Sequence, residues 1–174
     1  MTRPELEHII RAAGAIADDP DIVVIGSQAV LGQFPDAPAE FLRSMEADLY
    51  PRSRPERSDL VEGGIGEGSP FAREFGYYAH GIGPETAILP EGWEQRLVRV
   101  ENENTRHVRG WCLEVHDLAV AKLAAGREKD LEFVAGLMRL NMVDRNILLT
   151  RLEQTPLPDE RREINRARIG RDCK

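Results

Sequence analysis

The sequence predicts an α/β fold of the α+β type, in which a mixed sheet flanked by helices is followed by a helical C-terminal part. Three observations support this prediction. Residues 22–26, IVVIG, form a short apolar run rich in β-branched residues, as expected for a strand buried on both faces. Helical and strand-like segments alternate over the first two thirds of the chain. From residue 117 onward the patterns are helical only.

The other elements of the first half follow from helix and turn signals. Pro4 lies at the start of an amphipathic stretch, and Ser69 and Pro70 suit the N-cap and first position of a later helix. The polar stretch 52–59 is expected to be exposed. The glycine-rich stretch 62–68 is expected to be a loop, which either closes over a substrate or only connects its neighbours. The predicted elements are helices at 4–17, 28–33 and 70–79, and strands at 22–26 and 45–50.

The second half contains three strand-like pieces and then helices. Pro156 and Pro158 mark the end of the last strong helical pattern. We expect a single domain, 1–174, with a sheet-containing core at 1–116 and a helical part at 117–174. The predicted elements are strands at 86–90, 95–101 and 110–115, helices at 117–126, 130–140 and 144–154, and a highly charged helix to about residue 169.

The composition predicts a cytoplasmic globular protein with no membrane segment. The chain has 174 residues, of which 41% are hydrophobic and 30% charged. No apolar run approaches the roughly 18–20 residues that a membrane span needs, and the N-terminus lacks the apolar core of a signal peptide. The two cysteines, Cys112 and Cys173, make no disulfide framework. Cys112 lies in an apolar segment and is expected to be buried and inert.

The net charge of −7 argues against a general nucleic-acid coat, which needs a basic face. It leaves open an enzyme that acts on a nucleotide or on one RNA end, because bound metal ions supply positive charge locally.

Two acidic residues in the strand at 45–50 suggest a metal site. Glu46 and Asp48 are two residues apart, so in a strand they project from the same face. Two adjacent carboxylates repel each other, and a divalent metal ion between them removes the repulsion. Metal centres that move phosphoryl groups use such oxygen ligands. The alternative stays open that they are ordinary acidic residues near a strand end.

Gly26 and Ser27 separate the first strand from the helix that follows it. A glycine lets a phosphate approach the backbone, and a serine with the start of a helix offers hydrogen-bond donors to phosphate oxygens. A simple turn is the alternative. The order of strand, Gly-Ser, helix and a second strand with Glu-x-Asp favours phosphate binding.

The pattern formed by Gly26-Ser27 and Glu46-Ala47-Asp48 resembles the signature of the nucleotidyltransferase fold, the polymerase-β-like superfamily. A closer resemblance covers roughly residues 22–134, through segments such as GSQAVLGQFP, SMEADLYP and CLEVHDLAVAKLAAGREKDLEF. These are similar to an uncharacterised bacterial group of nucleotidyltransferase-like proteins near the abortive-infection toxins of the AbiEii type.

The resemblance implies an activity and further site residues. It implies transfer of a nucleoside monophosphate from a nucleoside triphosphate to an RNA or protein hydroxyl, with Mg²⁺ or Mn²⁺ as cofactor. A toxin–antitoxin or phage-defence setting would add a cognate antitoxin as partner. In the toxins a lysine and a downstream aspartate complete the active site, and the matching residues here are Lys122 and Asp130. Lys122 would also bind the triphosphate.

The residues themselves leave alternatives for this pair. Lys122 is the only charged residue between Leu118 and Gly126, in a helix that is apolar all round. It either extends its ammonium to the surface or faces a polar cavity. Asp130 is equally suited to cap the N-terminus of the next helix.

One feature departs from the superfamily pattern, which usually includes a third carboxylate on a later strand. Glu101 and Glu114 are the available acids, and neither is an obvious match. The departure leaves open a weak enzyme, an enzyme that uses Asp130 instead, or a nucleotide-binding or protein-interaction module that has lost catalysis. His80, His107 and His116 show no metal-ligand spacing, which argues against zinc.

Overall fold

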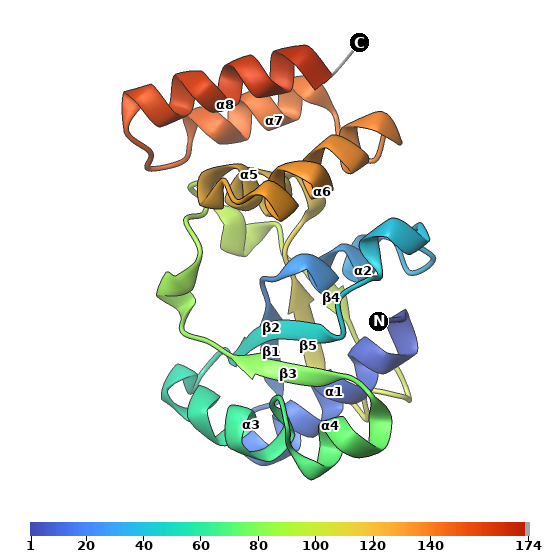
Figure 1. The fold of residues 1–174 in the computed structure, drawn as a ribbon. Coiled ribbons are helices and arrows are strands. Elements are labelled where there is room, and N and C mark those ends of the chain that lie inside the picture. Colours follow the sequence, from blue (N-terminus) through green and yellow to red (C-terminus); the bar gives the residue numbers. More distant parts are fainter. Residues whose placement is uncertain (173–174) are drawn as a thin grey trace. The chain divides into compact units, whose positions relative to one another are not determined.

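The computed structural model describes residues 1–172, and it confirms the predicted mixed α/β class (Figure 1). The strands are β1 Asp21–Val24, β2 Glu46–Pro51, β3 Tyr78–Gly81, β4 Val98–Val100 and β5 Arg109–Cys112. The α-helices are α1 Arg3–Ala17, α2 Val30–Gln33, α3 Ser58–Ile65, α4 Pro70–Phe75, α5 Val115–Ala125, α6 Glu128–Arg139, α7 Arg145–Glu153 and α8 Asp159–Asp172. Short 3₁₀ turns are η1 Ser27–Ala29, η2 Ala39–Phe41, η3 Pro55–Arg57, η4 Pro84–Thr86 and η5 Trp93–Gln95.

The strands form one mixed sheet with the order β3-β2-β1-β5-β4. The central strand β1 is antiparallel to β2 and parallel to β5. The outer pairs are parallel for β2 and β3 and antiparallel for β4 and β5. The strands β1 and β2, which follow each other in the sequence, therefore lie side by side, as consecutive strands usually do.

The chain divides into two compact units. The first comprises Met1–Thr86 and Leu97–Leu113 and contains the whole sheet with α1 to α4. The second comprises Ala87–Arg96 and the chain from Glu114 onward, and it contains α5 to α8. The predicted change from core to helical part at residue 116 lies close to the third crossing between units, at Leu113 and Glu114. That the chain is a single domain stays a prediction.

In the first unit, α1 and α3 pack on one face of the sheet. A Cβ atom on Gly110 would lie 2.5 Å from Cδ1 of Ile10 in α1, and one on Gly81 would overlap the backbone of Ser58 in α3. The opposite face we call the polar face. The strand registers place on it Tyr78 and His80 of β3, Glu46 and Asp48 of β2, Asp21 of β1, Arg109 and Trp111 of β5, and Arg99 of β4.

Two secondary-structure predictions around β3 were wrong. The helix expected over 70–79 ends at Phe75, because Gly76 adopts a left-handed conformation, with φ of +77°, and caps it. The chain then extends and pairs with β2 as an edge strand. The strand expected at 86–90 is absent, because Thr86 ends the 3₁₀ turn η4 and residues 87–90 form no helix or strand. The outer strand of the sheet is therefore the segment just after the glycine.

The loop expected at 62–68 is also wrong over its first half, which belongs to α3. Val61 and Ile65, one helical turn apart, are buried and anchor the helix. Gly64 lets α3 approach α1, because a Cβ atom there would lie 2.9 Å from Cδ1 of Ile16. Packing outweighs the poor helix propensity of two consecutive glycines.

The helical unit follows the predicted pattern. Helix α5 ends at Gly126, whose φ of +70° makes a left-handed cap. Asp144 caps α7 by accepting hydrogen bonds from the backbone N–H of Asn146 and Ile147, at 2.7 and 3.0 Å. The core of this unit is formed by apolar side chains that include Leu118, Leu123, Leu137, Leu148 and Leu152.

Cys112 is buried as predicted, and burial raises the pKa of its thiol to about 12. Cys173 lies outside the described residues.

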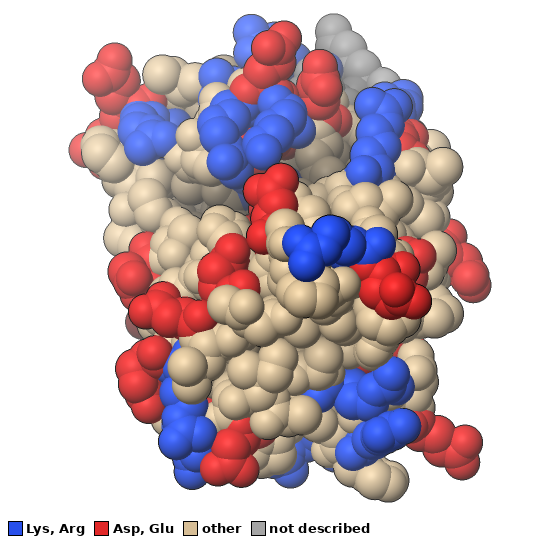
Figure 2. Space-filling view, turned by 60° about the horizontal axis from the view of Figure 1, so that its bottom comes forward, with Lys and Arg blue, Asp and Glu red and all other residues tan. Residues whose placement is uncertain are grey.

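Over residues 1–172, no helix combines the length and apolar character required to span a membrane. On the surface drawn in Figure 2, blue basic and red acidic side chains are interspersed, in agreement with the argument against a nucleic-acid coat.

Candidate metal centre

Glu46 and Asp48 project from the polar face of β2, as their spacing predicts. Ala47 between them is fully buried on the other face. The side chains of Glu46 and Asp48 are 38% and 30% exposed, so both carboxylates are partly shielded but accessible. The register of the sheet therefore places the two acids on one accessible face, and their binding of a metal ion stays a prediction.

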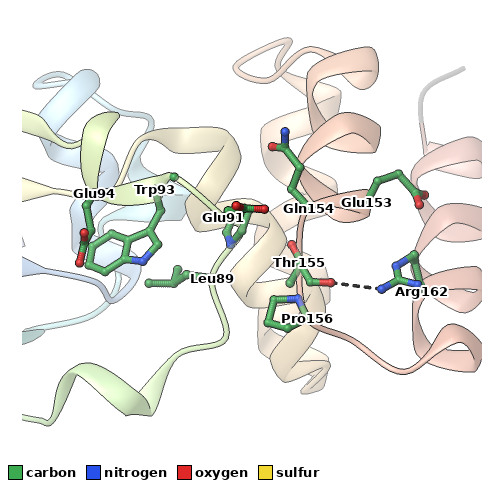
Figure 3. A pocket seen from close by; sticks show the side chains of 11 residues that line it. Leu89, Glu91, Trp93, Glu94, Glu153, Gln154, Thr155, Pro156 and Arg162 are labelled. Atoms are coloured by element: carbon green, nitrogen blue, oxygen red, sulfur yellow. Dashed lines mark hydrogen bonds between the residues drawn. The ribbon is translucent and has the colours of Figure 1, made fainter.

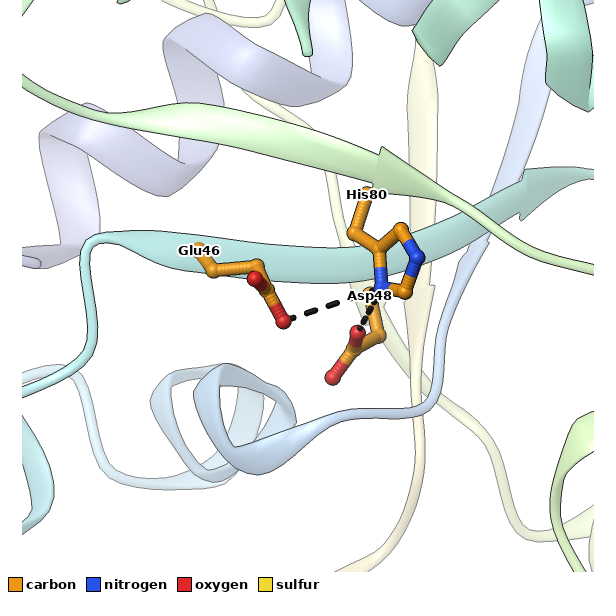
Figure 4. Close-up of side chains that lie close together, drawn as sticks. All are labelled: Glu46, Asp48 and His80. Atoms are coloured by element: carbon orange, nitrogen blue, oxygen red, sulfur yellow. Dashed lines mark hydrogen bonds and ion pairs between the residues drawn. The ribbon is translucent and has the colours of Figure 1, made fainter. Parts of the chain in front are cut away.

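His80 joins the two acids from the neighbouring strand (Figure 4). It is the register partner of Asp48 across the β2–β3 pair. Its Nδ1 atom lies 2.9 Å from Oδ1 of Asp48 and 3.7 Å from Oε1 of Glu46. One ligand atom from each residue lies within 4.8 Å of the other two. We call these three residues the metal cluster.

The charges of the metal cluster influence one another. Burial raises the pKa of Glu46, and the nearby negative charge of Asp48 raises it further. Burial alone would lower the pKa of His80, but the hydrogen bond and charge of Asp48 and the charge of Glu46 outweigh it, so this pKa is raised. The hydroxyl of Tyr78 donates a long hydrogen bond, 3.4 Å, to Glu46. The two acids of the cluster therefore favour a positive charge beside them.

Gly26 lies against the acids from the end of β1. A Cβ atom at this position would overlap Oδ2 of Asp48 and lie 2.7 Å from Cβ and Cγ of the same residue. The backbone N–H of Ile25 donates to the carbonyl of Asp48 at 3.0 Å, which fixes the two strands here. The glycine is thus required by the Asp48 side chain itself, a reason that the sequence did not indicate.

Ser27 begins the 3₁₀ turn η1, which runs directly into the single-turn helix α2. Its hydroxyl has no hydrogen-bond partner among residues 1–172, so it is available to a ligand. Of the helix expected at 28–33, only the four residues of α2 are α-helical. A helix of one turn is too short for its dipole to form a phosphate-binding site. Phosphate binding here would depend on the hydroxyl and on individual backbone N–H groups.

The donor set suits a divalent metal ion. Two carboxylates and one imidazole are ordinary ligands for such ions, and neighbouring ligands of one ion stand about 3 Å apart when each lies about 2.1 Å from it. The 2.9 Å between Nδ1 of His80 and Oδ1 of Asp48 meets this requirement, the 3.7 Å to Oε1 of Glu46 is wider, and all three ligand atoms lie within 4.8 Å of one another.

Lys122 and Asp130 meet in the helical unit. The Nζ atom of Lys122 lies 3.0 Å from Oδ1 of Asp130, and Arg127 donates to Oδ2 of Asp130 at 2.6 Å. The ring of Phe133 lies 4.6 Å from the same ammonium. Lys122 and Asp130 are both buried. Lys122 therefore does not extend to the surface, and it has a buried acid as its partner.

The Asp130 carboxyl is held in its ionised form. Burial alone would raise the pKa of Asp130, but hydrogen bonds from Arg127 and Lys122, with their positive charges, outweigh it and lower this pKa. The alternative role of Asp130 as a helix cap was wrong, because α6 begins two residues earlier with Arg127 at its N-cap. The structure brings together the two residues that the resemblance assigned to catalysis.

The two candidate third acids have other partners. Glu101 pairs with Arg99. Glu114 caps α5 by accepting from the backbone N–H of His116 at 3.0 Å, and it contacts Nδ1 of the same histidine at 2.7 Å. Neither belongs to the metal cluster. The third member of the cluster is His80.

His80 is the site residue that sequence reasoning missed. The predicted helix over 70–79 ends just before His80, and that prediction gives the histidine no relation to Asp48. The available signal was Gly76, a residue suited to end a helix, followed by polar Tyr78 and His80 on either side of buried Ala79. This alternation is typical of a strand.

Residues 5–169 match a protein family described as "Nucleotidyltransferase of unknown function (DUF6036)". The chain belongs to this family. No curated protein and no solved structure matches it. Membership of this nucleotidyltransferase family agrees with the resemblance in Gly26-Ser27 and Glu46-x-Asp48. The closer relation to toxins of the AbiEii type stays a prediction.

This nucleotidyltransferase-family chain also has a hollow in its helical unit, of about 630 Å³ (Figure 3). Arg162 donates to the carbonyl of Thr155 at its wall, at 3.3 Å. The predicted site residues do not line it. The lining residues are Leu89–Glu94, Glu153–Pro156 and Arg162.

Proposed function

We propose that this protein is a metal-dependent nucleotidyltransferase that moves a nucleoside monophosphate from a nucleoside triphosphate to a hydroxyl of RNA or protein. The observation that carries the proposal is the metal cluster on the polar face beside Gly26-Ser27. Family membership supports nucleotidyl transfer in general.

In this proposal Glu46 and Asp48 hold the divalent ion, Mg²⁺ or Mn²⁺. A bound ion supplies charge neutralisation at the phosphates and favours loss of the proton from the acceptor hydroxyl. The hydroxyl oxygen forms a bond to the α-phosphorus, the α–β phosphoanhydride bond breaks, and pyrophosphate leaves. Ser27 and the backbone after Gly26 orient the triphosphate, since the Ser27 hydroxyl lacks a partner among the described residues.

Lys122 and Asp130 enter the proposal through the resemblance, as residues that complete catalysis, with Lys122 binding the triphosphate. The support from the structure is their contact, since Nζ of Lys122 lies 3.0 Å from Oδ1 of Asp130. The same pair is equally suited to a structural role, and the variant Lys122→Met distinguishes that role from binding of the triphosphate.

The narrower setting also belongs to the proposal. An RNA or protein acceptor, a cognate antitoxin and a toxin–antitoxin or phage-defence role in the cytoplasm follow from the AbiEii-type resemblance alone. The net charge of −7 is compatible with an acceptor that is recognised locally rather than by a broad basic surface.

A second candidate function is a nucleotide-binding or protein-interaction module with weakened or lost catalysis. The observation that favours it is that His80, and not a third carboxylate, joins Glu46 and Asp48 from a later strand. A binding module would retain nucleotide affinity without releasing pyrophosphate.

The test is transfer from α-labelled nucleoside triphosphates with Mg²⁺ or Mn²⁺, read as pyrophosphate release and as label on RNA or protein. The variant Glu46→Gln with Asp48→Asn should abolish release. A matched control, Glu56→Gln with Asp59→Asn, removes two exposed acids from the same unit and should retain it. Nucleotide binding without release in the unmodified protein would favour the binding module.

A further inference from the structure

His80 is placed on the sheet so that its ring nitrogen, rather than a carbon edge, faces the two acids. The parallel register of β2 and β3 puts His80 directly opposite Asp48. In Figure 4 the imidazole of His80 points toward the same space as both carboxylates. Packing does not require this orientation, because His80 lies on an edge strand and its side chain is 48% exposed.

The separations among the three side chains fall in the range spanned by ligands of one ion. An ion with six ligands at about 2.1–2.3 Å has neighbouring ligands about 3 Å apart and opposite ligands about 4.4 Å apart. The Nδ1 atom of His80 lies 2.9 Å from Asp48 and 3.7 Å from Glu46. Small side-chain adjustments therefore let all three residues reach a single ion.

Fold stability does not explain the arrangement. A half-exposed ion pair such as that of His80 and Asp48 contributes little to the free energy of folding. The adjacent charge of Glu46 opposes folding, since two carboxylates share the site. A ligand set accounts for the three side chains together.

We propose that His80 is the third protein ligand of the ion held by Glu46 and Asp48, and that its imidazole makes this site prefer a first-row transition-metal ion, such as Mn²⁺, over Mg²⁺. The inference rests on the proposed function for the metal itself and adds the ligand and the class of ion. Mg²⁺ favours oxygen ligands and retains its waters, whereas imidazole nitrogen suits the transition metals.

The direct test detects nitrogen bound to the metal. Mn²⁺ is added to the full chain, and pulsed electron paramagnetic resonance measures electron spin-echo modulation from ¹⁴N. We expect an imidazole ¹⁴N signal in the unmodified protein, its loss in His80→Ala, and its retention in His107→Ala, which removes an exposed histidine of the same unit. Bound Mn²⁺ without a signal that depends on His80 would overturn the inference.

A competition titration tests the preference. The unmodified protein should bind Mn²⁺ about tenfold or more tightly than Mg²⁺, and His80→Asp, which offers oxygen instead of nitrogen, should narrow that ratio. An unchanged ratio in His80→Asp would contradict the inference.

Different results would overturn the role of His80 and the metal centre formed by Glu46 and Asp48. If Mn²⁺ binding is lost in Glu46→Gln with Asp48→Asn but unchanged in His80→Ala, the role of His80 is overturned and the proposed function stands. Mn²⁺ binding that survives loss of both acids, or no Mn²⁺ binding at all, overturns the metal centre of the proposed function as well.

Discussion

Gly26 lies directly against the carboxylate of Asp48, so that the end of one strand leaves room for the acid on the next. The φ of Gly26, −83°, is ordinary for any residue, so the glycine is needed for space and not for backbone freedom. A Cβ atom at residue 26 would lie 2.7 Å from Cβ and Cγ of Asp48. The Gly-Ser junction therefore has a structural role beside any ligand role.

The first prediction concerns Gly26→Ala. Removing backbone freedom from the unfolded chain would stabilise by about 0.4–1 kcal/mol. The overlap with Asp48 costs about 1–3 kcal/mol, and we expect it to prevail. Urea unfolding should therefore show a net loss of stability, and calorimetry should show weaker metal binding because Asp48 is displaced.

Two comparisons sharpen this prediction. Gly63→Ala changes a helical glycine with nothing within 4 Å of an added Cβ, so it should be neutral or stabilising. Combining Gly26→Ala with Asp48→Gly should recover part of the lost stability, because neighbouring changes are not additive. Additive losses would mean that the two residues do not interact.

The second prediction concerns the metal-free acids. Glu46→Gln with Asp48→Asn should raise the free energy of unfolding, by less than about 1 kcal/mol, because it removes the repulsion of two partly exposed carboxylates. The measurement is urea unfolding with a chelator. Glu56→Gln with Asp59→Asn should show no comparable gain. A clear loss in the first variant would mean that the acids stabilise the fold.

The third prediction is a pH dependence from Asp130. The folded-state pKa of Asp130 is lowered, so its ionised form stabilises the folded protein. This contribution is fully present above the ordinary aspartate pKa of about 4 and is lost as pH falls through the lower folded value. The stability difference between the unmodified protein and Asp130→Asn should therefore shrink below about pH 4. Asp59→Asn, at an exposed position, should show no such change, and an equal change there would contradict the assignment.

The fourth prediction is that Lys122→Met destabilises the protein, because it removes one partner of a buried acid. Loss of a whole partner costs roughly 3–5 kcal/mol, and the remaining contact with Arg127 should reduce that cost. Lys129→Met, at an exposed position of the same segment, should melt like the parent.

The same variant tests the predicted ligand role of Lys122. If Lys122 binds the triphosphate, nucleotide titration with Lys122→Met should show lost affinity at temperatures where the variant is folded. A destabilised variant that retains full affinity and transfer would assign Lys122 to structure alone. Unchanged stability with unchanged affinity would contradict both roles.

The sequence alone indicated β1, β2 and the site residues Glu46 and Asp48, because these depend on local patterns. The run IVVIG is apolar enough to require burial, and Glu46-x-Asp48 has the period of a strand, so one face of β2 was determined without knowing its neighbours. The buried surroundings of Lys122 were likewise visible in its apolar helix.

The rest depends on contacts between distant segments. His80 reaches Asp48 only because β3 pairs in parallel with β2 after a connection through α3 and α4, and the sequence does not state that register. Gly76 ends α4 and releases the segment that becomes β3. The close approach of Gly26 to Asp48 is equally a property of the paired strands.

The most direct test of the central claim is a crystal of the protein soaked with Mn²⁺ and a nonhydrolysable nucleoside triphosphate. We expect an anomalous scattering peak within bonding distance of Glu46 and Asp48, with the phosphates beside Gly26 and Ser27. A nucleotide bound elsewhere, such as the hollow lined by Trp93 and Arg162, or a peak away from both acids, would contradict it.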